Sequence, residues 1–294
     1  MVLWLKLSTF AKDLSCAVRE KGFSVRKQGF KMDKNQIGLA VRKYLEEKGI
    51  ERMELKAAMF DMDGVLFDSM KNHAKCWHET MAHFGLDLPE WEAYMHEGRT
   101  GAGTINMVSI RQRGYEATED EIERIYRHKS ELFNQCPKAE RMPGAYELLV
   151  KVKASGVVPM VVTGSGQVTL LDRLNRNFPD IFREELMVTA FDVKYGKPNP
   201  EPYLMGMEKY GKWCERCDGK SAVLSPANFI VVENAPLGVQ AGVAAGVFTI
   251  AVNTGPLPDD ALLSQGANLL FHSMQEFCDE WEKVVGGLKF NSFS

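Results

Sequence analysis

The spacing of hydrophobic residues changes near residue 55 of this chain. Before that point, apolar residues recur at helical spacing between Ile37 and Leu45. After it, the apolar run 57–60 is followed directly by Asp61, a pattern typical of a buried strand that leads into a loop. We therefore predict that residues 1–50 form an N-terminal extension with one helix, ahead of a separate folded core.

Helical spacing dominates the next segment, residues 69–143. One apolar stripe runs from Ala74 to Phe84. A second follows the pair Thr118 and Glu121, whose spacing predicts a capped helix start. The pattern therefore predicts a helical unit in this part of the chain.

From residue 144 onward, predicted strands and helices alternate. Short apolar runs predict strands at 157–162, 186–190, 229–232, 247–252 and 269–271, with helices near 145–154, 167–177, 201–210 and 237–245. This alternation indicates a parallel sheet with helices on both faces, and the strand ending at Phe60 must join it. We expect an α/β fold: a three-layer, Rossmann-like core of residues 51–68 and 144–294 with an inserted helical cap domain, 69–143.

Composition and charge narrow the function classes. The 36 Lys and Arg residues nearly balance the 39 Asp and Glu residues, and a net charge of −3 gives no reason to expect a nucleic acid or an anionic membrane as partner. No apolar run approaches the roughly 18 residues that a membrane helix needs. We expect a cytoplasmic protein that is a monomer or weak dimer.

The cysteine and histidine spacings predict no metal centre. Only Cys214 and Cys217 form a CxxC pair, whereas a zinc site needs about four ligands, so we expect two ordinary loop cysteines. His78 and His83 are five residues apart and would lie on different faces of a helix.

Polar residues suited to a phosphate follow four of the predicted strands. In chain order they are Asp61 with Asp63, Thr163 with Gly164 and Ser165, Lys197, and Glu233 with Asn234. Ligands of an open parallel sheet bind at the carboxyl ends of its strands. We therefore expect these residues to form one site.

Elementary chemistry gives these residues distinct roles in phosphoryl transfer. Asp61 is the candidate nucleophile, and Lys197 supplies positive charge that favours its ionised form. Asp63 can protonate the leaving oxygen and later deprotonate water, which requires a raised pKa. The Thr163 hydroxyl and the N–H groups of Gly164 and Ser165, at a predicted helix start, can hold phosphate oxygens.

A divalent cation would protect a carboxylate nucleophile from repulsion by an anionic phosphate ester. Carboxylate and amide oxygens are the ligands that Mg²⁺ prefers. We expect Mg²⁺ as cofactor, held by Asp61, Asp63, Glu233 and Asn234.

Four sequence motifs resemble those of the haloacid dehalogenase-like superfamily. They are Met59–Ser69, Val161–Ser165, Gly196–Pro200 and Val231–Ala235. The resemblance spans residues 55–272, and the helical insertion is similar to the cap of the β-phosphoglucomutase and phosphoglycolate phosphatase branch. It implies a magnesium-dependent phosphatase of small phosphorylated metabolites that works through an aspartyl-phosphate.

The resemblance also implies a role for the cap. The loop Gly98–Gly103 would face the active site, and cap closure would exclude water and bring in groups that select the substrate. Ser69, His73 and Arg99 are the cap residues that we expect to contact the substrate, beside Gly164 and Ser165 of the core.

Two departures from the family pattern affect the choice of reaction. Asn234 stands where the family usually has Asp, which should weaken the metal site. Gly101 and Gly166 stand where the mutase pattern has Arg and Lys, with Arg99 two residues from the first of these. These losses favour hydrolysis, with a sugar-phosphate mutase as the alternative.

Two other readings fit the sequence less well. A dehalogenase needs neither Asp63 nor a metal. A non-catalytic binding protein of this fold would be expected to lose Asp61 or Lys197, and both are present.

Overall fold

The computed structural model describes residues 34–165, 170–219 and 224–288. Within these ranges, short runs of β-branched and other apolar residues form six strands. They are β1 (Ala57–Phe60), β2 (Val158–Val162), β3 (Met187–Val188), β4 (Phe229–Glu233), β5 (Phe248–Val252) and β6 (Leu269–Phe271). They form one sheet in the order β3-β2-β1-β4-β5-β6, and every neighbouring pair is parallel.

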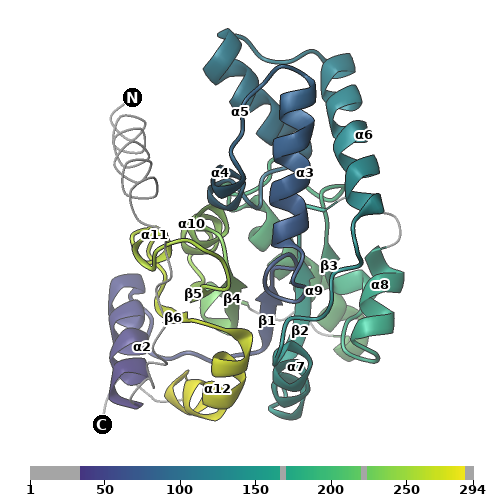
Figure 1. Cartoon of the computed structure of the whole chain (residues 1–294). Helices are drawn as coiled ribbons and strands as arrows, with labels where there is room; N and C mark the ends of the chain where they lie inside the picture. Colours follow the sequence, from purple (N-terminus) through teal and green to yellow (C-terminus); the bar gives the residue numbers. More distant parts are fainter. Residues whose placement is uncertain (1–33, 166–169, 220–223, 289–294) are drawn as a thin grey trace. The chain divides into compact units, whose positions relative to one another are not determined.

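Both faces of the sheet are apolar and covered by helices (Figure 1). Side chains alternate along β1, so that Ala58 and Phe60 pack on one face while Ala57 and Met59 pack on the other. The first face packs against α2 (Lys34–Lys48), α7 (Ala145–Ala154), α8 (Leu170–Asn177) and α12 (Met274–Leu288). The second packs against α9 (Glu201–Asp218) and α10 (Pro236–Ala244). The predicted three-layer, Rossmann-like fold class is confirmed.

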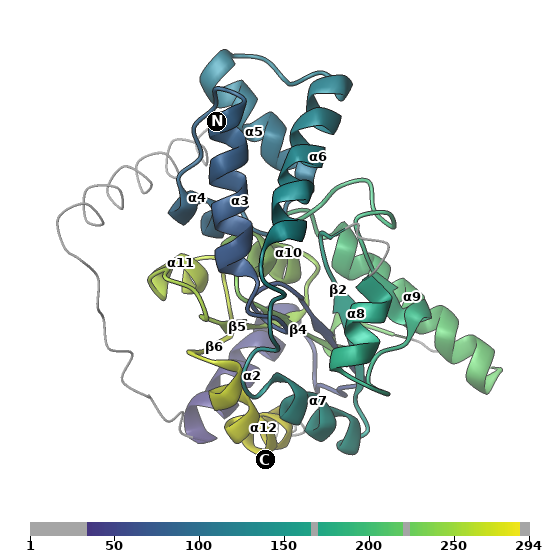
Figure 2. The same cartoon turned by 45° about the vertical axis from the view of Figure 1, so that its right-hand side comes forward.

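Residues between β1 and α7 form a group of four helices with its own apolar cluster. The helices are α3 (Met70–His83), α4 (Glu90–Met95), α5 (Gly101–Arg113) and α6 (Glu119–Gln135). The predicted capping box is present at the start of α6, where Thr118 and Glu121 cap one another. Figures 1 and 2 both show the group on the side of the sheet where β1 leads into α3.

Several elements differ from the predicted ones. Helix α9 continues to Asp218, because its later turns pack Trp213 against Tyr210, so Cys214 and Cys217 lie on a helix and the loop prediction is wrong. Helix α12 was not predicted, and a short helix, α11 (Asp260–Leu263), precedes β6. In the described ranges, no helix is long and apolar enough to cross a membrane.

Helix α2 belongs to the packed core, although we predicted it as part of an extension. Ile37, Val41 and Leu45 join the cluster on the first face of the sheet, and the Tyr44 hydroxyl donates to the carbonyl of Gly246 at 2.9 Å. Residues 1–33 of the predicted extension lie outside the described residues.

Candidate active site

The sheet order brings the ends of β1 and β4 together. These strands are neighbours in the sheet. Beyond β1 lie β2 and β3, and beyond β4, on the other side, lie β5 and β6, so the strand order reverses between β1 and β4. Open α/β sheets bind ligands at such a position. The N–H of Asp61 donates to the carbonyl of Val232 at 3.0 Å, so Asp61 and Glu233 emerge side by side. Both side chains are buried.

Lys197 joins these two carboxylates. Its Nζ lies 2.5 Å from Asp61 Oδ1, 2.5 Å from Glu233 Oε1 and 3.2 Å from the carbonyl oxygen of Val162. Burial acts to lower the pKa of Lys197, but the carboxylates of Asp61 and Glu233 outweigh it and raise the pKa above its ordinary value. Lys197 therefore stays positively charged although only 2% of its surface is exposed.

Lys197 only partly offsets the factors that disfavour the ionised form of Asp61. Burial raises the pKa of Asp61 well above its usual range, Glu233 and Asp63 act in the same direction, and Lys197 opposes them. Three carboxyl groups, those of Asp61, Asp63 and Glu233, thus act against the single ammonium group of Lys197. A further cation at this edge of the sheet would favour the ionised form of Asp61.

The oxygen atoms around Asp61 suit a Mg²⁺ site in which the protein supplies only a few of the ligands. Asn234 Oδ1 is buried and has no hydrogen-bond partner, so it is free to bind a cation. A Cβ on Gly64 would lie 2.0 Å from Asn234 Nδ2, so glycine is needed there to leave room for the amide. The described ranges hold no group of three or more His, Cys, Asp or Glu arranged as a metal site. Mg²⁺ commonly takes only one or two carboxylates, with water and phosphate oxygens completing its shell.

Glu233 is committed to protein partners. Its Oε1 accepts from Lys197 and from the Tyr203 hydroxyl at 2.6 Å, and its Oε2 accepts from the N–H of Asn234 at 3.1 Å. A Cβ on Gly238 would lie 2.0 Å from a carboxylate oxygen of Glu233, so the first turn of α10 encloses this side chain. Glu233, predicted as a metal ligand, therefore orients Lys197 in the structure, and the sequence analysis missed Tyr203.

Asp63 is held by residues at the start of α3. The Ser69 hydroxyl donates to Asp63 Oδ1 at 2.5 Å, and His73 Nε2 lies 3.2 Å from the same oxygen. Burial acts to raise the pKa of Asp63, but His73, the Ser69 hydrogen bond and Arg173 outweigh it and lower the pKa. The prediction that Asp63 has a raised pKa is therefore wrong for the protein without bound phosphate. Ser69 is fully buried, and its hydroxyl group helps to orient the Asp63 carboxylate.

A lysine that the sequence analysis missed fixes the orientation of His73. Lys129 Nζ lies 2.9 Å from His73 Nδ1. An ammonium can only donate, so Nδ1 accepts and Nε2 carries the proton that faces Asp63. The sequence did indicate that Lys129 is buried, because it lies four residues from both Ile125 and Phe133 and so falls on the apolar face of α6.

The strand end after β2 keeps its predicted residues close to the site. The Thr163 hydroxyl is buried and accepts from the N–H of Ser165 at 3.1 Å. A Cβ on Gly164 would lie 3.3 Å from the carbonyl oxygen of Gly98, so the four-helix group approaches this loop closely. Residues 166–169, which include Gly166 and part of the predicted helix start, lie outside the described residues.

The segment after α4 covers Lys197. Gly98 has a φ of +89°, and a Cβ there would lie 2.8 Å from Lys197 Cδ. Only the first part of the predicted loop 98–103 is a loop, because α5 starts at Gly101 with the Thr100 hydroxyl accepting from the N–H of Gly103 at 3.1 Å.

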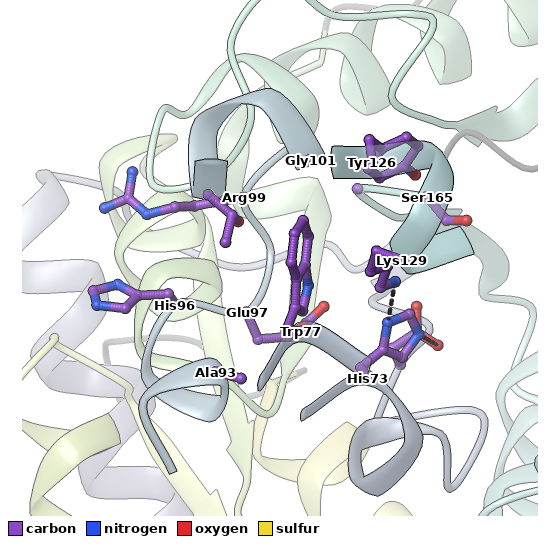
Figure 3. A pocket seen from close by; sticks show the side chains of 13 residues that line it. His73, Trp77, Ala93, His96, Glu97, Arg99, Gly101, Tyr126, Lys129 and Ser165 are labelled. Carbon is purple, nitrogen blue, oxygen red and sulfur yellow. Dashed lines mark hydrogen bonds and ion pairs between the residues drawn. The ribbon is translucent and has the colours of Figure 1, made fainter. Parts of the chain in front are cut away.

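A pocket that is partly open to solvent lies between the four-helix group and the core. Asp63, Gly164 and Ser165 line its core side. The other lining residues include His73, Trp77, His96, Glu97, Arg99, Thr104, Tyr126 and Lys129. Figure 3 shows Arg99 and His96 extending to the side of the pocket opposite Lys129 and His73.

Comparison with known proteins agrees with this geometry. Residues 58–252 match the family model described as haloacid dehalogenase-like hydrolase. Hexitol phosphatase A of Escherichia coli is 29% identical over 76% of this chain and 94% of its own length. Glycerol-1-phosphate phosphohydrolase 2 of Saccharomyces cerevisiae is 29% identical over 69% of this chain and 76% of its own length.

A solved structure from Bacteroides vulgatus, provisionally named a β-phosphoglucomutase, is 61% identical to this chain. It matches with a TM-score of 0.82 over 88% of this chain and 100% of its own. The family match covers about two thirds of the sequence, including the carboxyl ends of β1, β2 and β4. The chain belongs to the haloacid dehalogenase-like hydrolase family.

Proposed function

We propose that this chain is a Mg²⁺-dependent phosphatase that hydrolyses a small phosphorylated metabolite, such as a sugar phosphate, through an aspartyl-phosphate on Asp61. The observation that carries the proposal is the contact between the buried Asp61 carboxylate and Lys197 at 2.5 Å, at the strand edge that also holds Asp63. The phosphatases named among the relatives support the same reaction class. We further propose that the protein acts in the cytoplasm as a monomer or weak dimer.

In the first step, a carboxylate oxygen of Asp61 attacks phosphorus and the ester oxygen leaves. Asp63 gives its proton to that oxygen, so the alcohol departs neutral. The negative charge of the bound phosphate works against the lowered pKa of Asp63 and favours its protonated form. Ser69 and His73 position the carboxyl for this transfer.

In the second step, Asp63 takes a proton from a water molecule, whose oxygen attacks phosphorus and displaces the Asp61 carboxylate. Lys197 offsets the negative charge of the transferring group in both steps. The Thr163 hydroxyl and the N–H groups of Gly164 and Ser165 hold phosphate oxygens. Mg²⁺, held by the Asp61 carboxylate, the main-chain carbonyl oxygen of Asp63 and the Asn234 amide oxygen, would neutralise the negative charge shared by nucleophile and phosphate.

Removing the metal should abolish phosphate release, and restoring Mg²⁺ should recover it. Asn234→Asp adds a negative ligand beside the buried, unpartnered amide oxygen, so activity should saturate at several-fold lower Mg²⁺. The measurement is phosphate release against free Mg²⁺ after treatment with a chelator. Activity that survives chelation would contradict the metal site, and an unchanged Mg²⁺ dependence in Asn234→Asp would remove Asn234 from it.

A sugar-phosphate mutase is the second candidate, because the Bacteroides vulgatus protein that is 61% identical carries that provisional name. A mutase must hold a second phosphate with cationic groups. A Cβ on Gly101, where the mutase pattern has Arg, would lie 2.3 Å from the Tyr126 ring, so this position cannot take a larger side chain without displacing Tyr126. The structure therefore favours hydrolysis.

The two reactions differ in their products. Given β-glucose 1-phosphate with a trace of the bisphosphate, the enzyme should release inorganic phosphate, if it accepts the sugar, and form little glucose 6-phosphate. Both products can be quantified in one reaction. Efficient formation of glucose 6-phosphate without phosphate release would establish the mutase instead.

A further inference from the structure

The pocket beside Asp63 is where the alcohol part of a substrate would lie, an assignment that rests on the proposed function. Asp63 must reach the leaving oxygen to protonate it, and Asp63 lines this pocket. The atoms beyond that oxygen would therefore meet Trp77, Glu97, Tyr126 and Lys129, all of which line the same pocket.

Glu97 is a partly buried acidic residue that the proposed mechanism does not use. Burial of its carboxylate raises its pKa, and Asp63 acts in the same direction, while His73 and Lys129 oppose them. Glu97 lines the same pocket as Asp63, His73 and Lys129. In Figure 3, the side chain of Glu97 runs past Trp77 toward Lys129 and His73.

Lys129 does not give the pocket a spare positive charge. Its ammonium donates to His73 Nδ1 at 2.9 Å and lies 5.4 Å and 4.8 Å from the ring centres of Trp77 and Phe133. Burial lowers the pKa of Lys129, whereas Glu97 and Asp63 act to keep it charged. Arg99 also lines the pocket, but Figure 3 shows its guanidinium extending away from this group.

We propose that Glu97 selects substrates whose alcohol part is uncharged and rich in hydroxyl groups, namely monophosphates of small polyols and sugars. A carboxylate accepts hydrogen bonds from hydroxyl groups, and such charge-assisted bonds are strong. A second phosphate or a carboxylate on the substrate would meet the like charge of Glu97 in a poorly solvated space. Glu97 thus both attracts the preferred class and repels the other.

The test compares wild type, Glu97→Gln and Glu131→Gln. The amide introduced by Glu97→Gln keeps the shape of the glutamate side chain and removes its charge. Glu131 lies exposed on α6, so Glu131→Gln makes the same change in net charge away from the pocket. The measurement is kcat/KM for phosphate release from sorbitol 6-phosphate, glycerol 1-phosphate and 2-phosphoglycolate, with 4-nitrophenyl phosphate as a general phosphatase substrate.

Wild type should prefer the better polyol phosphate to 2-phosphoglycolate by about 100-fold or more, because like-charge contacts cost several kcal/mol. Glu97→Gln should reduce this ratio about tenfold or more, mainly by raising kcat/KM for 2-phosphoglycolate. Glu131→Gln should leave the ratio unchanged.

A ratio that Glu97→Gln does not change would overturn the proposal, as would a wild-type preference for 2-phosphoglycolate. If wild type hydrolyses 4-nitrophenyl phosphate but neither polyol phosphate, the inference about Glu97 fails and the phosphatase assignment stands. If wild type hydrolyses none of the four compounds, the proposed function itself fails and the inference falls with it.

Discussion

Asp61→Asn should lower kcat by at least about 1,000-fold, because an amide cannot attack phosphorus and no covalent intermediate can form. The fold should survive the change. Burial holds the pKa of Asp61 above its usual range, so the ionised carboxyl is less favourable in the folded protein than in the unfolded chain at neutral pH. The Tm of Asp61→Asn should therefore equal or exceed that of wild type.

The matched control is Asp68→Asn, which changes an exposed aspartate in the same motif. Its kcat should stay close to wild type. Phosphate release and thermal unfolding, measured on both variants, separate a catalytic role from a structural one. A folded Asp61→Asn protein that keeps a tenth of wild-type activity would rule out Asp61 as the nucleophile.

Lys197→Gln should lower kcat by about 1,000-fold, since the ammonium no longer offsets the charge that the transferring phosphoryl group carries. Stability should also fall, because Lys197 bridges the buried Asp61 and Glu233 at 2.5 Å from each. Removing one partner from a buried ion pair leaves the other charge uncompensated. Activity and Tm should thus drop together in this variant.

A double variant separates the two effects. Lys197→Gln combined with Glu233→Gln removes one charge of each sign, so Tm should recover toward wild type while activity stays low. Lys194→Gln, which changes an exposed lysine on the same loop, should alter neither quantity. If the double variant regains both stability and activity, Lys197 would have a structural role only.

The sequence predicted the parts of the site that strand ends position. Asp61, Thr163 and Glu233 each follow an apolar run, and a parallel sheet brings such positions to one edge whatever the connecting segments do. The helix pattern between β1 and α7 was also readable, because its apolar stripes repeat at regular spacing. Helix α12 could have been predicted on the same grounds, since its buried residues from Met274 to Leu288 recur at helical spacing.

The sequence did not reveal contacts made between distant segments. Lys129 meets His73 across 56 positions of chain, and Tyr203 meets Glu233 across 30, so no local pattern connects them. The lowered pKa of Asp63 follows from the same contacts, because His73 acts on it only after α3 and the end of β1 have packed. Burial and partners that depend on tertiary packing decide such properties.

We propose that hydrolysis proceeds through two successive displacements at phosphorus, the first of them by Asp61. The stereochemistry at phosphorus tests it directly, and the test does not require the intermediate to accumulate. The substrate carries a thiophosphoryl group that is chiral because it holds one sulfur atom and two different oxygen isotopes. The configuration of the released thiophosphate is then determined. Each in-line displacement inverts the configuration, so two displacements should give overall retention. Net inversion would show direct attack by water and would contradict an aspartyl-phosphate on Asp61.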